Sequence, residues 1–234
     1  MDATKLPELW ILRVVSLIVL VVLFQVCIAR VPTIGHETKR RWQHALTGHA
    51  LVQISYLLTR STAIALLLMA SIGMFVWKVF FFENFQQAFG PLLRTKEING
   101  EQFLPGAFYF LLGTAVTLVI VGGNQDDDGV DNDQGWVIAR YAVECLALAD
   151  PVASWIGSKV PSPKINAGTS VSGCLACFAT AWCVGFFMLS QELKDSYTLT
   201  VGAIACTIAE GLPFGNDNMN IPILTALAVD KLGR

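Results

Sequence analysis

The stretch that decides the fold spans residues 149–173 and reads ADPVASWIGSKVPSPKINAGTSVSG. It places the carboxylate of Asp150, followed by a proline, deep inside an apolar segment. The chain then passes through a short loop with two lysines, Lys159 and Lys164, and begins another apolar segment near residues 168–170. An ionisable side chain inside an apolar span is costly, so Asp150 is a candidate functional residue. Nearby lysines suit a site that handles phosphate and a metal ion together.

The composition around this stretch indicates a helical membrane protein. The chain of 234 residues is 54% hydrophobic and only 15% charged, and its mean hydropathy is +0.56. Soluble domains carry about a quarter charged residues. Several apolar runs approach the roughly 20 residues that cross a hydrocarbon core, and they are too long and continuous for barrel strands. We therefore predict an all-α fold, a polytopic transmembrane helical bundle in which residues 1–234 form one membrane-embedded domain.

Eight apolar segments are predicted as spans, and the second and last are short, which gives about seven or eight crossings. They are Leu9–Ala29, His44–Leu58, Thr62–Phe82, Phe103–Gly123, Trp136–Gly157, Thr169–Leu189, Thr198–Leu212 and Met219–Val229. The mixed loop 83–102 has room for a short interfacial helix. The first segment is too long for a signal-peptide core, and no transit peptide precedes it, which favours the endoplasmic reticulum.

Charge in the loops predicts which ends of these segments face the cytosol. Alternation places four loops on one side, and these carry more Lys and Arg than the opposite loops, so the positive-inside rule puts them in the cytosol. The four loops are 30–43, 83–102, 158–168 and 213–218. The same alternation brings Arg40 and Arg41, the Asp150–Lys164 stretch and the Asp217-Asn218 break to one face.

Other features are interpreted as structural. The net charge of −2 gives no indication of a nucleic-acid partner. The six cysteines lie in apolar segments, so even the pair Cys174 and Cys177 is interpreted as packing. The acidic loop 126–133 is similar to a calcium loop but lacks the terminal Glu of an EF-hand, so we expect a solvated loop.

Four short motifs lie in order along residues 37–230. They are ETKRRWQH at 37–44 with Gly48, GAFYFLLG at 106–113, ADPVASWIG at 149–157, and EGLP at 210–213 with DNMNIP at 217–222. They are similar to E-x-x-R-K-x-x-H-x-x-x-G, G-x-x-Y-x-x-x-G, [GA]-D-x-x-A-x-x-x-G and E-x-x-P…D-N-x-x-[IV]-P. Their order and spacing resemble the CTP-dependent lipid-alcohol kinases, the family of dolichol kinase, phytol kinase and yeast-type diacylglycerol kinase. One departure is Thr169, where the family usually has a lysine.

This resemblance implies transfer of the terminal phosphate of CTP to the hydroxyl of a membrane lipid, either diacylglycerol or a polyprenol or phytol-type alcohol. It implies Mg²⁺ or another divalent cation as cofactor. Forked Arg donors suit phosphate, and carboxylate and amide oxygens suit Mg²⁺. The expected roles are catalysis for Asp150, His44 and Glu210; nucleotide and phosphate binding for Arg40, Arg41, Gly157, Lys159, Lys164, Thr169 and Ser170; and metal binding for Asp150, Asp217 and Asn218. Backbone N–H groups at the start of the segment near Ser170 are expected to receive phosphate.

Two other functions stay open from the sequence. A phosphatidate cytidylyltransferase also has a D-x-x-A…G stretch, but its K-T-x-E-G motif is not found here. A small membrane transporter is the other, with Asp150, Arg140 and Glu144 forming an ion path. Arg140 and Glu144 are four residues apart on one predicted helix, so we expect them to share a face and to pair with each other.

Overall fold

The computed structural model describes residues 6–31, 33–89, 93, 97, 103–121, 134–166, 168–213 and 215–233. In these ranges the regular structure is helical, and the strand-like pairing is limited to an isolated bridge between Lys164 and Ser170. The prediction of an all-α fold is confirmed. The acidic loop 126–133 lies outside the described residues.

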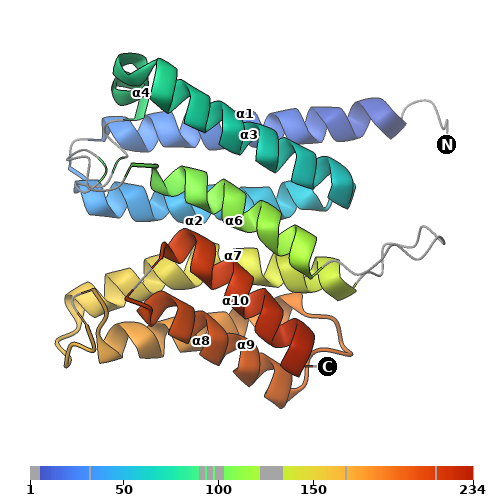
Figure 1. Cartoon of the computed structure of the whole chain (residues 1–234), viewed down its shortest axis with the longest axis vertical. Helices are drawn as coiled ribbons and strands as arrows, with labels where there is room; N and C mark the ends of the chain where they lie inside the picture. Colours follow the sequence, from blue (N-terminus) through green and yellow to red (C-terminus); the bar gives the residue numbers. More distant parts are fainter. Residues whose placement is uncertain are drawn as a thin grey trace.

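In the described part of the chain, eight long helices run back and forth along the molecule, and a short helix follows the third (Figure 1). They are α1 (Leu6–Arg30), α2 (His36–Ser55), α3 (Arg60–Phe80), α4 (Phe82–Phe89), α6 (Gly106–Ile120), α7 (Gln134–Lys159), α8 (Val171–Met188), α9 (Ser196–Gly211) and α10 (Asp217–Leu232). Each predicted segment corresponds to one long helix, and α4 occupies the loop where a short helix was expected.

The start of α2 differs from the prediction. The helix begins at His36, so Arg40 and Arg41 lie on its first turns and not in a basic loop. Hydropathy alone misses this part because its side chains are charged. An ion pair between Arg40 and Glu37, three residues apart, is formed within the helix, and pairs at this spacing stabilise a helix. The two arginines are therefore carried on a regular scaffold.

Helix α7 forms the centre of the bundle and packs against α2, α8 and α10. Its Ile138, Tyr141, Cys145 and Leu146 side chains are fully buried. Small residues allow close approach of the helices that carry the candidate site. A Cβ atom added at Gly48 of α2 would lie 2.5 Å from the Cβ of Ala147 on α7.

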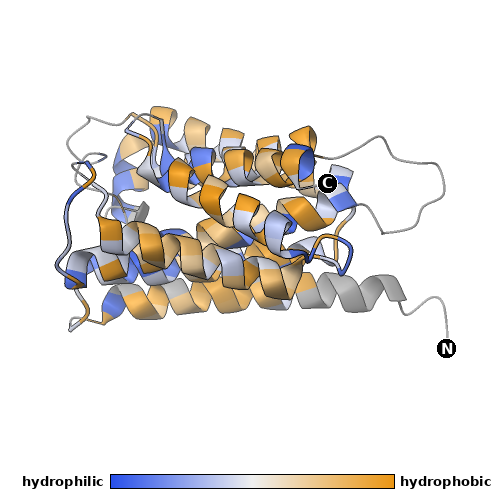
Figure 2. Ribbon diagram, turned by 90° about the horizontal axis from the view of Figure 1, so that it is seen from below, coloured by the Kyte–Doolittle hydropathy of each residue, from blue (hydrophilic) through white to orange (hydrophobic). Residues whose placement is uncertain are grey.

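The outer surface of the bundle carries large apolar side chains. Examples on α1, α3 and α8 are Leu20, Met69, Ile72, Leu175 and Phe187, each more than half exposed. Figure 2 shows apolar residues along the helices and hydrophilic residues mainly toward their ends. Among the described residues, two helices, α3 and α8, are long and apolar enough to cross a membrane, and α6 and part of α1 are apolar but shorter. The prediction of seven or eight spans goes further than this finding.

The helix order brings three distant parts of the sequence to one end of the bundle. The start of α2, the loop from α7 to α8 and the start of α10 all lie at the end of the molecule near α4 (Figure 1). The sequence predicted this arrangement from alternation alone.

Candidate active site

A histidine and a carboxylate join α2 to α7 at this end of the bundle. His44 Nε2 lies 3.5 Å from Asp150 Oδ2 and 3.1 Å from the backbone oxygen of Leu146. The two side chains are only 13% and 12% exposed, and the ring of Phe110 packs edge-on against His44. A carbonyl oxygen only accepts, so it favours a proton on Nε2. In the neutral ring Nδ1 is then the atom that can accept a proton.

The two arginines of α2 lie one turn before His44 and have different partners. Arg41 Nε donates to Ser154 Oγ on α7 at 3.1 Å, while Arg40 forms an ion pair with Glu37 at 3.0 Å. Burial raises the pKa of the Glu37 carboxyl, but the Arg40 and Arg41 guanidinium groups outweigh burial, so the pKa is lowered. Both arginines thus bring fixed positive charge close to His44.

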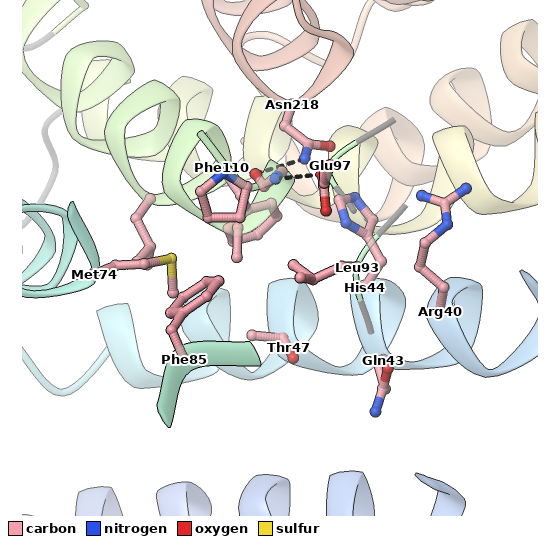
Figure 3. Close-up of a pocket in the computed structure, with 14 residues that line it drawn as sticks. Arg40, Gln43, His44, Thr47, Met74, Phe85, Leu93, Glu97, Phe110 and Asn218 are labelled. Atoms are coloured by element: carbon pink, nitrogen blue, oxygen red, sulfur yellow. Dashed lines mark hydrogen bonds between the residues drawn. The ribbon is translucent and has the colours of Figure 1, made fainter. Parts of the chain in front are cut away.

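A cavity of about 300 Å³ opens beside His44 between α2, α3, α4, α6 and the start of α10 (Figure 3). One part of its lining is polar, with Arg40, Gln43, His44, Thr47, Glu97 and Asn218. Another part is apolar, with Met74, Phe85, Leu93, Phe110 and Leu111. The cavity therefore suits a ligand with one polar and one apolar part.

Asn218 closes the polar part of this cavity from α10. Its Nδ2 donates to the backbone oxygen of Gly106 at 2.8 Å, and the Gly106 N–H donates to Glu97 Oε1 at 2.7 Å. Asn218 Oδ1 is buried and has no hydrogen-bond donor among the described residues. A buried oxygen left in this state costs about 1–3 kcal/mol. A ligand hydroxyl or a cation in the cavity would offset that cost.

The N–H groups at the start of α8, where the prediction places phosphate, already have acceptors within the chain. The N–H groups of Gly168 and Thr169 both donate to Asn166 Oδ1. Ser170 Oγ caps α8 by accepting from the Gly173 N–H, and the other N–H groups of residues 171–174 also have acceptors within the chain. Because the loop satisfies its own donors, Thr169 and Ser170 hold the loop together in this structure.

The other predicted phosphate-binding residues lie around that loop. Gly157 packs closely against it, because a Cβ added there would lie 2.8 Å from Ser170 Oγ. Lys159 and Lys164 are exposed at this end of the bundle, where they add positive charge around the site and do not line the cavity.

The predicted metal ligands do not form a complete metal-binding site among the described residues. Asp217 is the first residue of α10, and Glu210 is half-buried near the end of α9. Among the described residues, no group of three or more His, Cys, Asp or Glu could hold a metal ion. Mg²⁺ is commonly bound by one or two carboxylates together with substrate phosphates. Asp150 contacts His44 and Asn218 lines the cavity beside it, and carboxylate and amide oxygens are donors that suit Mg²⁺.

Arg140 and Glu144 do not form the predicted pair. Arg140 donates to the side chain and backbone oxygen of Ser55 at 2.9 Å each, and Glu144 Oε1 lies 2.7 Å from His49 Nδ1. Both reach across to α2, because α2 packs along the face of α7 that they share. With Asp150 next to His44, the three residues of the predicted ion path have separate partners.

Three residues near the site had no predicted role. Ser154 lies four residues after Asp150, so its position on the same helix face was a usable signal. Gln43 falls within the first motif, next to His44. Glu97 comes from the stretch between α4 and α6, whose sequence has no recognisable pattern, and only the fold brings its carboxylate to the start of α6.

Comparisons with protein-family models, with curated proteins and with solved structures give no match to this chain. The function is therefore inferred from the site itself and from the motifs that the site contains.

Proposed function

We propose that this protein is an integral-membrane lipid kinase that transfers the terminal phosphate of CTP to the hydroxyl of a membrane lipid alcohol. The observation that carries the proposal is the meeting of three motifs around one cavity. The cavity is lined by Arg40 and His44 from α2, by Phe110 from α6 and by Asn218 from α10, and Asp150 of α7 contacts His44.

The surface of the bundle supports a membrane location. Soluble monomers rarely expose large contiguous apolar areas, whereas α1, α3 and α8 carry many exposed Leu, Ile, Met and Phe side chains. In the proposed arrangement the long helices cross the bilayer seven or eight times. The cavity then lies at the cytosolic end, where the basic loops are. A lipid hydroxyl and a soluble nucleotide meet at such an interface.

Phosphoryl transfer depends on positioning and on neutralising charge. Arg40 and Arg41 supply fixed cations for the phosphates of the nucleotide, and Lys159 and Lys164 add positive charge nearby. His44 takes the proton from the attacking lipid hydroxyl, and Asp150 holds His44 in place and stabilises its charged form. A bound Mg²⁺ would neutralise the phosphate charge, with Asp150 and Asn218 as oxygen donors and Asp217 and Glu210 close to the same end.

The test is a transfer assay with purified protein in detergent–lipid micelles. Terminally labelled CTP or ATP is offered with Mg²⁺ against diacylglycerol, phytol and dolichol. We expect transfer of label from CTP to a lipid with release of CDP, and a loss of about 100-fold or more in Asp150→Ala. Glu144→Gln is the matched control, because Glu144 also pairs with a histidine of α2 but does not line the cavity.

Two results would contradict the proposal. Release of pyrophosphate from CTP together with formation of a cytidylyl lipid would identify a cytidylyltransferase. Absence of transfer from either nucleotide, with wild type and Asp150→Ala both folded and indistinguishable, would exclude a kinase.

A further inference from the structure

A second cavity of about 320 Å³ lies between α1, α2, α3, α6 and α7. Its walls are formed mainly by aliphatic side chains, among them Leu51, Leu67 and Leu118. The polar residues in its lining are Ser55, Thr114 and Arg140. This composition differs from that of the first cavity, which also has the carboxylate of Glu97 and the amides of Gln43 and Asn218.

The polar groups in the second cavity bond to the protein itself. Thr114 Oγ1 donates to the backbone oxygen of Phe110 at 2.8 Å. Ser55 Oγ donates to the Val52 oxygen and accepts from Arg140. An occupant of this cavity is therefore surrounded by hydrocarbon, and burial of apolar surface is the interaction that would hold it.

The two cavities follow one another along the same helix faces. Leu111 of α6 lines both of them. On α2, Thr47 lines the first and Leu51 the second; on α3, Met74 lines the first and Ala70 the second. Residues four apart lie on one face of a helix. The apolar cavity therefore lies next to the cavity beside His44 along these helices, and Leu111 borders both.

Arg140 lines the apolar cavity on the side away from the candidate site, next to Ser55. Its guanidinium is bonded to Ser55 and lies over the rings of Tyr56 and Trp136, at 3.9 and 4.4 Å from their centres. Along α2, the lining runs from Leu51 to Ser55, which is about 6 Å at 1.5 Å per residue, and Leu58 follows in the turn after the helix. The cavity is thus a pocket of limited length that begins next to the candidate site.

We propose that this apolar cavity holds the hydrocarbon chain of the lipid alcohol whose hydroxyl lies beside His44, and that the substrate is a single-chain alcohol. The proposal rests on the kinase function proposed above. A single-chain alcohol has one polar end and one apolar chain, which matches the polar lining beside His44 and the apolar cavity next to it. Diacylglycerol has two acyl chains on neighbouring carbons, whereas the apolar cavity that shares Leu111 with the site has a volume of about 320 Å³, which suits one chain.

The test measures binding of a lipid without any nucleotide. Radiolabelled hexadecanol is bound to the purified protein in detergent, and unlabelled octanol, phytol and diacylglycerol compete. Ala70→Phe fills the cavity next to its junction with the site. Ala65→Phe is the matched control, because Ala65 is also an exposed alanine of α3 but does not line either cavity.

We expect Ala70→Phe to weaken hexadecanol binding about tenfold, as displacement of roughly two methylenes would. Ala65→Phe and wild type should bind equally. Leu67→Ala enlarges the same cavity and should shift the preference toward the branched chain of phytol. Diacylglycerol should compete poorly with hexadecanol in all four proteins.

Unchanged hexadecanol binding in Ala70→Phe would overturn the proposal. Strong competition by diacylglycerol would also overturn it if Ala70→Phe weakened diacylglycerol binding to the same extent as hexadecanol binding. The pocket would then not select a single chain. The binding assay is independent of catalysis. Chain binding that depends on Ala70 without any transfer from CTP would refute the kinase and leave the pocket assignment in place.

Discussion

His44 and Asp150 form the pair on which the proposed chemistry depends. If His44 is the base and Asp150 positions it, His44→Ala and Asp150→Asn should each lower kcat about 100-fold or more. The double variant should be no slower than the slower single variant, because the two side chains act as a unit. The measurement is a double-mutant cycle of kcat and of kcat/KM for transfer from CTP.

The neighbouring pair of His49 and Glu144 gives the control for this cycle. It joins the same two helices at 2.7 Å and does not line the cavity. His49→Ala should therefore lower the unfolding temperature and leave kcat close to the wild-type value. Losses that multiply in the His44 and Asp150 double variant would show that the two residues act independently, against the proposed roles.

The contact between α2 and α7 is the element that sets the geometry of this pair. Gly48 lies one turn after His44, and a Cβ there would lie 2.5 Å from the Cβ and 3.2 Å from the Cα of Ala147. Gly48→Ala should push the helices apart and destabilise the protein by about 1–3 kcal/mol. It should also lower kcat, since His44 would move away from Asp150. Thermal unfolding in detergent and the transfer assay measure the two effects.

Gly73 of α3 provides a comparison variant that separates the effect of helix packing from the effect of helix propensity. A Cβ at Gly73 would meet nothing within 4 Å, and alanine is a better helix former than glycine by up to about 1 kcal/mol. Gly73→Ala should therefore leave the unfolding temperature unchanged or higher, with normal kcat. If Gly48→Ala and Gly73→Ala had the same effect on the unfolding temperature and on kcat, a special role for close packing at Gly48 would be refuted.

The whole molecule has its candidate site at one end, and the proposed membrane orientation puts that end in the cytosol. Epitopes inserted after Thr33 and after Pro161 should be recognised on the cytosolic side of sealed vesicles. An epitope after Gln191, in the loop before α9 at the opposite end, should be recognised only after permeabilisation. Recognition of all three from one side would contradict a bundle in which these helices alternate across the bilayer.

Much of the fold was predictable because its signals are local. Long apolar runs separated by polar breaks predict the eight long helices and their order, and the alternation of those helices predicts that the motifs meet at one end. The cost of an acid in an apolar segment is enough to identify Asp150 as a candidate. Boundaries were less predictable where charged residues form helix, as at Arg40 and Arg41 in the first turns of α2.

The sequence by itself determined the helical class, the order of the segments and the identity of Asp150 and His44 as candidates. Only the tertiary structure decided their partners. Asp150 lies by His44, and Arg140 and Glu144 bind α2 instead of each other. It also decided that the N–H groups at the start of α8 already have acceptors and that an apolar cavity lies next to the cavity beside His44. Hydropathy and motif spacing act within one segment, whereas partners and cavities depend on how the faces of distant helices pack, which no local pattern encodes.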